Sequence, residues 1–280
     1  MVLARFQRSC ILLFALVLLL CAGAARADIT IVLQNDFIEH YKLRATIDTA
    51  YTVDKAHPRP NPPSKDGDLH VAGRAEEVKL PIVAAIMNAK DDSAAVKMIH
   101  GAEGSGQPIS LSGVWRLWCE HGGNSEQIQG AALDAFDTTN PEHVFEIHPI
   151  TKLQNRSLLP TLKPIAGFTT KDAHDAFTKY EGIRCRIIPG QDTTTLETTM
   201  AGFNYVEFVM ELNSKPVEVE DGLMVFCKVR DLQGELLVRN RRMVMVKDSE
   251  VERKTRGQPA GTLAHAVKRS KQLGYNGPAL

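Results

Sequence analysis

Short segments in which apolar and polar residues alternate, separated by turn residues, recur along this chain and constrain its fold more than any other feature. In residues 143–153, Phe145 and Ile147 alternate with Glu146 and His148. Successive side chains of a strand point to opposite faces, so this period of two indicates strands with one apolar and one polar face. Turn residues at short intervals in the second half favour antiparallel pairing. The chain is therefore predicted to be an α+β protein, mainly antiparallel β with a few short helices.

The patterns assign an expected element to most of the chain. Strands are predicted at residues 45–53, 68–73, 94–101, 109–120, 143–153, 183–188, 193–199, 204–213, 223–229 and 235–246. Helices are predicted at residues 35–44, 78–89, 125–136, 171–181 and 263–273. Four prolines make residues 57–68 an exposed loop. The order of strands in the first half is similar to that of small OB-like barrels, and the second half is predicted to be a helix followed by a β-meander.

The N-terminal segment has the pattern of a secretory signal peptide. Arg5 and Arg8 precede an apolar run at residues 11–20, and Ala25 and Ala27 form an A-x-A cleavage pattern. The apolar run is too short for a membrane-spanning helix, and no comparable run follows it. The mature chain is therefore expected to begin after Ala27 and to be periplasmic or secreted, without a membrane span.

Four segments are predicted on these grounds: a signal peptide (1–27), a β-rich domain (28–160), a domain with a helix and a β-meander (161–249) and a flexible basic tail (250–280). Loss of the three arginines in residues 1–27 leaves 30 basic against 33 acidic residues. This slightly acidic balance gives no electrostatic attraction for nucleic acid.

The mature chain keeps Cys119, Cys185 and Cys227. Three cysteines are too few for a disulfide scaffold, so a hydrophobic core must stabilise the fold.

Two short acid-x-His motifs are the candidate metal site. Asp68 and His70 lie on one face of their predicted strand, and Glu146 and His148 lie on one face of theirs. If the two strands are neighbours, facing side chains are about 5 Å apart at Cβ, and four ligands converge on one divalent metal, zinc or manganese. The alternative is a solvated sheet face with ordinary surface pairs, and no HExxH or paired CxxC motif favours the metal.

A second set of polar residues on the same predicted face is a candidate ligand site. Arg116 and Trp118 lie on one face of a strand with Glu120, and a guanidinium beside an indole stacks on flat ligands. With few aromatic residues and no basic stripe, a small-molecule or carbohydrate ligand is favoured over nucleic acid. Glu120, Arg116 or His121 is the candidate accessory base or anion-orienting group beside a metal.

Four phrases of the first half resemble a group of uncharacterised bacterial exported proteins: KDGDLHVAGRA (65–75), LPIVAAIMNA (80–89), GVWRLWCEH (113–121) and NPEHVFEIHPITKL (140–153). The resemblance implies export and no particular activity. We therefore expect an exported, periplasmic binding or accessory protein whose ligand face lies on the sheet of the first half. The alternatives are a metal-dependent hydrolase acting on phosphodiesters and a structural or interaction protein.

Overall fold

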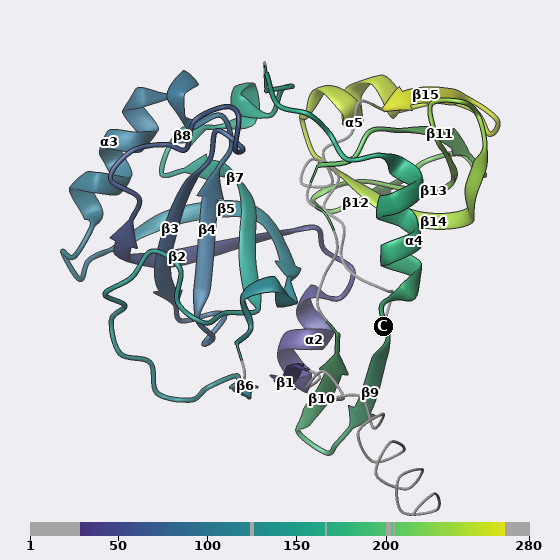
Figure 1. Ribbon diagram of the computed structural model, residues 1–280. Helices are drawn as coiled ribbons and strands as arrows, with labels where there is room; N and C mark the ends of the chain where they lie inside the picture. Colours follow the sequence, from purple (N-terminus) through teal and green to yellow (C-terminus); the bar gives the residue numbers. More distant parts are fainter. Residues whose placement is uncertain (1–28, 124–125, 166, 200–202, 204, 267–280) are drawn as a thin grey trace, which may run out of the picture.

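The computed structural model describes residues 29–123, 126–165, 167–199, 203 and 205–266 (Figure 1). The predicted signal peptide at residues 1–27 and the part of the predicted tail beyond residue 266 lie outside these ranges. The predicted α+β class is confirmed, because strands predominate and the helices are few and short. No helix within the described ranges is long and apolar enough to cross a membrane.

Five strands of the first half form a closed barrel. They are β2 (Thr46–Ala56), β3 (Leu69–Ala75), β4 (Ile82–Ile86), β5 (Pro108–Leu117) and β7 (Phe145–Leu153). Their order is β4-β3-β2-β5-β7, and a parallel pairing of β4 with β7 closes the ring. Helix α3 (Ser93–Ala102) joins β4 to β5. This topology fits the predicted OB-like barrel.

The barrel interior is apolar because alternate side chains of each strand point into it. Its buried core includes Ile47, Leu69, Ile82, Leu111, Phe145 and Ile147. Two glycines permit close approach between strands: a Cβ on Gly73 would lie 2.2 Å from the carbonyl oxygen of Thr52, and one on Gly113 would lie 2.4 Å from the side chain of Ile147. The apolar side of the alternating pattern is therefore the inward face, as the sequence predicts.

A second, four-stranded sheet contains strands from both halves of the chain. Its order is β6 (Gln127–Ile128), β1 (Ile29–Gln34), β10 (Thr193–Thr198) and β9 (Cys185–Pro189). Strand β1 pairs with β10 in antiparallel register from Ile29 opposite Thr198 to Gln34 opposite Thr193. Helix α2 (Asn35–Tyr41) follows β1 directly, as predicted. The β9–β10 hairpin of the second half thus pairs with the first strand of the described chain.

The third sheet belongs to the second half. Strand β13 (Gly222–Arg230) pairs with β11 (Phe208–Leu212), β12 (Val217–Val219) and β14 (Leu236–Val246), and β15 (Leu263–Ala266) pairs with β11. All of these pairs are antiparallel. Helix α4 (Ala173–Gly182) packs Phe177 onto the buried face of this sheet, and the side chain of Asp172 caps its first turn. Figure 1 shows this sheet beside the barrel. The short elements α5 (Glu250–Thr255) and β8 (Arg156–Ser157) complete the described regular structure together with three 3-10 turns.

Four predicted elements are wrong. Residues 78–89 hold strand β4 instead of a helix, because a fully buried strand has no polar face and its burial does not alternate. Residues 94–101 lie in helix α3 instead of a strand, and the carboxylate of Asp92 accepts a hydrogen bond from the Ala95 N–H at its first turn. A helix was predicted at residues 125–136, but the described residues of this range form strand β6 and irregular chain. A helix was also predicted at residues 263–273, but residues 263–266 form strand β15.

Candidate functional site

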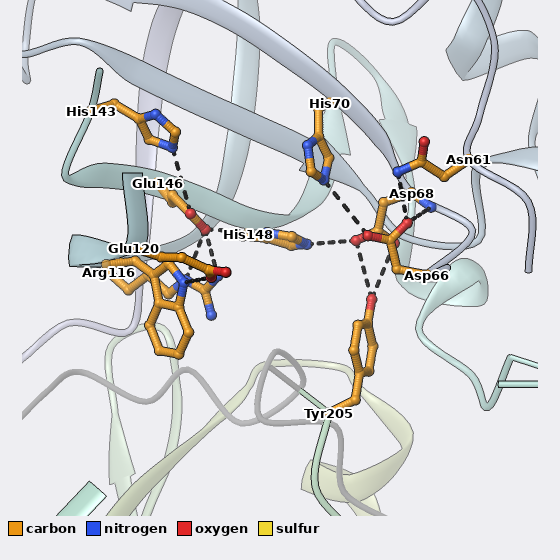
Figure 2. A network of polar contacts seen from close by, with 11 residues as sticks. Asn61, Asp66, Asp68, His70, Arg116, Glu120, His143, Glu146, His148 and Tyr205 are labelled. Atoms are coloured by element: carbon orange, nitrogen blue, oxygen red, sulfur yellow. Dashed lines mark hydrogen bonds and ion pairs between the residues drawn. The ribbon is translucent and has the colours of Figure 1, made fainter. Parts of the chain in front are cut away.

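The polar face of the barrel is covered by the second half of the chain. Asp68, Glu146 and His148 point away from the barrel core and are nevertheless only 0%, 5% and 4% exposed. Tyr205, which precedes β11, lies over Asp68, and Figure 2 shows Asp68 between the rings of His148 and Tyr205. The face that the alternating pattern predicts to be polar is therefore an internal contact surface between the two halves.

The two strands that hold the acid-x-His motifs are not adjacent, yet their side chains meet. Strand β4 lies between β3 and β7, and its Ala85 is the register partner of His70. The imidazole of His148 nevertheless reaches the residue that precedes β3. The His148 Nε2 lies 2.9 Å from Asp68 Oδ2, within hydrogen-bond distance.

On the other side, His148 contacts a buried ion pair. Arg116 and Glu146 are register partners on β5 and β7, and the Arg116 Nε donates to Glu146 Oε2 at 2.9 Å. The Nδ1 of His148 lies 3.3 Å from the same carboxylate oxygen, and His143 Nε2 lies 3.6 Å from Oε1. Both ring nitrogens of His148 thus face carboxylates, which places the imidazole as a link between Glu146 and Asp68.

The surroundings of Glu146 keep its carboxylate charged. Burial acts to raise the pKa of this carboxyl, but the Arg116 guanidinium and the nearby imidazoles of His143 and His148 outweigh burial and hold the pKa well below its usual range. The structure therefore places Glu146 in a buried ion pair with Arg116. Glu146 is linked to the predicted metal ligand Asp68 through the imidazole of His148, which lies within hydrogen-bond distance of both carboxylates.

Asp68 receives a further hydrogen bond from the second half. The Tyr205 hydroxyl lies 3.2 Å from Asp68 Oδ1 and 3.1 Å from Oδ2. Tyr205 could not be predicted as a site residue, because it lies 137 residues from Asp68 and no local pattern in the sequence links the two. Only the packing of the second half against the barrel brings the phenol to this carboxylate.

The described residues contain one group with metal-ligand spacing, formed by Asp66, Asp68 and His70, whose ligand atoms all lie within 4.8 Å of one another. His70 Nε2 and Asp66 Oδ2 are 4.0 Å apart. The four predicted ligands do not form one such group among these residues. Asp68 and His70 belong to it, whereas Glu146 and His148 lie on the other side of Asp68, to its left in Figure 2. Asp66 was missed, although its spacing in D-x-D-x-H is visible in the sequence.

The loop before β3 shapes this group. The Asp66 carboxylate accepts hydrogen bonds from the Asn61 side chain at 2.9 Å and from the Asp68 backbone N–H at 3.0 Å. The His57 ring stacks on the His70 ring with 5.0 Å between centroids. The side chains of Asp66 and His70 are 21% and 24% exposed, so the group is open to solvent on this side and buried at Asp68.

The predicted ligand-binding residues Arg116, Trp118 and Glu120 lie side by side, and their polar groups and rings contact one another. The Arg116 guanidinium lies 4.0 Å from the centroid of the Trp118 ring, and the Trp118 Nε1–H donates to Glu120 Oε2 at 2.9 Å. Arg116 and Trp118 are each 6% exposed, whereas Glu120 is exposed. His121 lies beyond them and stacks on His143 with 5.3 Å between centroids.

A small cavity separates these residues from the second half. It has a volume of about 20 Å³, room for roughly one water molecule. Its walls are Arg116, Trp118 and His148 from the barrel and apolar residues such as Phe177 and Met243 from the second half. The Arg116–Trp118 pair therefore faces the second half across this cavity, which has little room for a ligand.

Searches against protein-family models, curated proteins and solved structures gave no match. Inferences about activity therefore depend on the geometry described above.

Proposed function

We propose that this protein is an exported binding or accessory module that binds a divalent cation through Asp66, Asp68 and His70. The observation that favours this function is the convergence of two carboxylates and one imidazole within 4.8 Å at a partly open edge of the barrel. Two of the three residues are also ligands in the set predicted from the acid-x-His motifs. The buried position of Asp68 strengthens the electrostatic attraction for a cation, because the local dielectric constant is low.

Two carboxylates and one imidazole favour zinc or manganese as the bound cation. Imidazole nitrogen suits zinc, and carboxylate oxygens suit both zinc and manganese. Three protein ligands leave coordination positions for water, and through them the cation holds an oxygen of a small-molecule or carbohydrate ligand. The partly exposed side of the group, at Asp66 and His70, is where such a ligand enters.

The experiment is metal analysis and calorimetric titration of the purified chain from residue 28 onward, with zinc and manganese tested separately. We expect one equivalent of cation in the wild type and none in His70→Ala. His174→Ala is the matched control, because His174 is an exposed residue at the start of helix α4. Equal binding by wild type and His70→Ala, or no binding by the wild type, contradicts the proposal.

A metal-dependent hydrolase acting on phosphodiesters is the second candidate. The observation that favours it is that three ligands leave room for a metal-bound water, which is the arrangement of catalytic zinc sites. The His57 imidazole, stacked on His70, is a candidate for a proton-transfer group. Chelator-sensitive cleavage of a simple phosphodiester, restored by metal and lost in His70→Ala, is the expected result, and inactivity of the metal-loaded protein eliminates this candidate.

A further inference from the structure

The second half of the chain contributes a hydrogen bond, from Tyr205, to one of the proposed cation ligands Asp66, Asp68 and His70. Asp68, the buried member of the group, contacts Tyr205 through both carboxylate oxygens and His148 through Oδ2. Neither residue is among the three proposed ligands. We infer that Tyr205 and His148 are positioning residues that hold the Asp68 carboxylate in its ligand orientation, so that the second half completes a cation site built on the barrel. This inference rests on the proposed function.

The hydrogen-bonding capacity of a carboxylate is consistent with this role. An ionised carboxylate has about four lone-pair sites. The single Tyr205 hydroxyl proton and the Nε2 of His148 each meet one of these sites. Hydrogen bonds of this kind fix the rotation of a ligating carboxylate, and their loss commonly lowers metal affinity about 10- to 100-fold.

The phenol of Tyr205 is itself held in place. Its ring packs in a small apolar cluster with Met87 and Ile165, and the Phe168 ring lies 4.7 Å away between centroids. The carbonyl oxygen of Tyr205 accepts a hydrogen bond from the Lys171 N–H at 2.7 Å. The hydroxyl therefore reaches Asp68 from an ordered support formed by both halves of the chain.

The imidazole of His148 has a similarly fixed support. Its Nδ1 is anchored at 3.3 Å by the Glu146 carboxylate, which the Arg116 guanidinium holds in turn. Asp68 is thus fixed from two directions by groups on β7 and on the segment before β11. A cation that binds Asp68 more tightly in this arrangement also favours contact between the halves, because such coupling is reciprocal.

The test is the Tyr205→Phe variant, which keeps the packed ring and removes only the hydroxyl. We expect zinc or manganese to bind about 10- to 100-fold more weakly than to the wild type, at unchanged stoichiometry. Tyr180→Phe is the control, because its hydroxyl donates to a backbone carbonyl of the second half and not to Asp68. The absorption spectrum of bound Co²⁺ is the second readout: we expect it to change in Tyr205→Phe and to stay unchanged in Tyr180→Phe.

Two further outcomes separate this inference from the proposed function. Cation binding by the wild type that is lost in His70→Ala but unchanged in Tyr205→Phe overturns the inference alone. Absence of binding by the wild type overturns both. Should Tyr205→Phe fail to fold, His148→Gln and His148→Leu provide the same test, because glutamine retains a donor for Asp68 and is expected to keep more affinity than leucine; equal affinity in the two variants overturns the inference.

Discussion

Replacing Glu146 with glutamine removes one charge from a buried network and leaves its shape nearly unchanged. Glu146 is 5% exposed and Arg116 is 6% exposed, and two nitrogens of the guanidinium donate to the same carboxylate oxygen. Removing one partner of a buried ion pair leaves the other charge uncompensated, which costs about 3–5 kcal/mol. For about 250 mature residues, each kcal/mol corresponds to roughly 2–4 °C, so Tm is expected to fall by roughly 6–20 °C.

The stability lost in Glu146→Gln depends on pH, and the pKa of Glu146 determines whether the loss grows or shrinks as the pH falls. This pKa lies well below its usual range, because the Arg116 guanidinium and two imidazoles outweigh the opposite effect of burial. The carboxylate therefore contributes stability that is fully present above the unfolded-state value of about 4.3 and is lost as pH falls through the folded-state pKa. The difference between wild type and Glu146→Gln is expected to be full at pH 7 and to shrink below about pH 4.

Urea unfolding followed by circular dichroism measures the free energy of unfolding of each variant. Glu250→Gln is the control, because Glu250 forms an exposed i,i+4 pair with Lys254 and should leave the midpoint unchanged. The double variant Arg116→Met/Glu146→Met removes both charges and is expected to lose less stability than Glu146→Gln. A wild-type midpoint in Glu146→Gln at pH 7 refutes the account of a buried charge network.

Two further predictions concern the fold. Gly73→Ala places a Cβ 2.2 Å from a backbone oxygen and is expected to cost about 1–3 kcal/mol in urea unfolding, whereas Gly101→Ala in helix α3 meets no atom within 4 Å and should not destabilise; equal effects contradict the packing of the barrel. Burial raises the pKa of the Cys119 thiol to about 12, and Cys227 is also buried. In the purified chain from residue 28 onward, a thiol reagent at pH 8 is therefore expected to modify exposed Cys185 alone when the protein is native, and three thiols in urea. Rapid reaction of Cys119 in the native protein contradicts that burial.

The barrel could be predicted from sequence because its strands alternate clearly. Phe145 and Ile147 on β7 are buried in the core, and the order of the strands matches an OB-like barrel. Strand β4 was not recognisable, because all its residues are buried and a short apolar run fits a helix or a strand equally well. The pairing of β1 with β10 depends on contacts more than 150 residues apart, which local periodicity does not encode.

The candidate site was predicted in part for the same reason. Alternation correctly placed Asp68 and His148 on the outward face, and the two side chains meet even though β4 lies between their strands. The alternating pattern did not reveal that the second half buries this face. Arg116 and Trp118 were therefore expected to bind a ligand, whereas both are buried. Tyr205 is brought to Asp68 by tertiary packing alone, and no spacing in the sequence indicates it.

The most direct test of the cation site is anomalous X-ray diffraction from crystals of the mature chain soaked in manganese. We predict one strong anomalous peak within coordinating distance, about 2.0–2.3 Å, of one atom each from Asp66, Asp68 and His70. Absence of a peak at this position, or a peak bound by other residues of the barrel, contradicts the account.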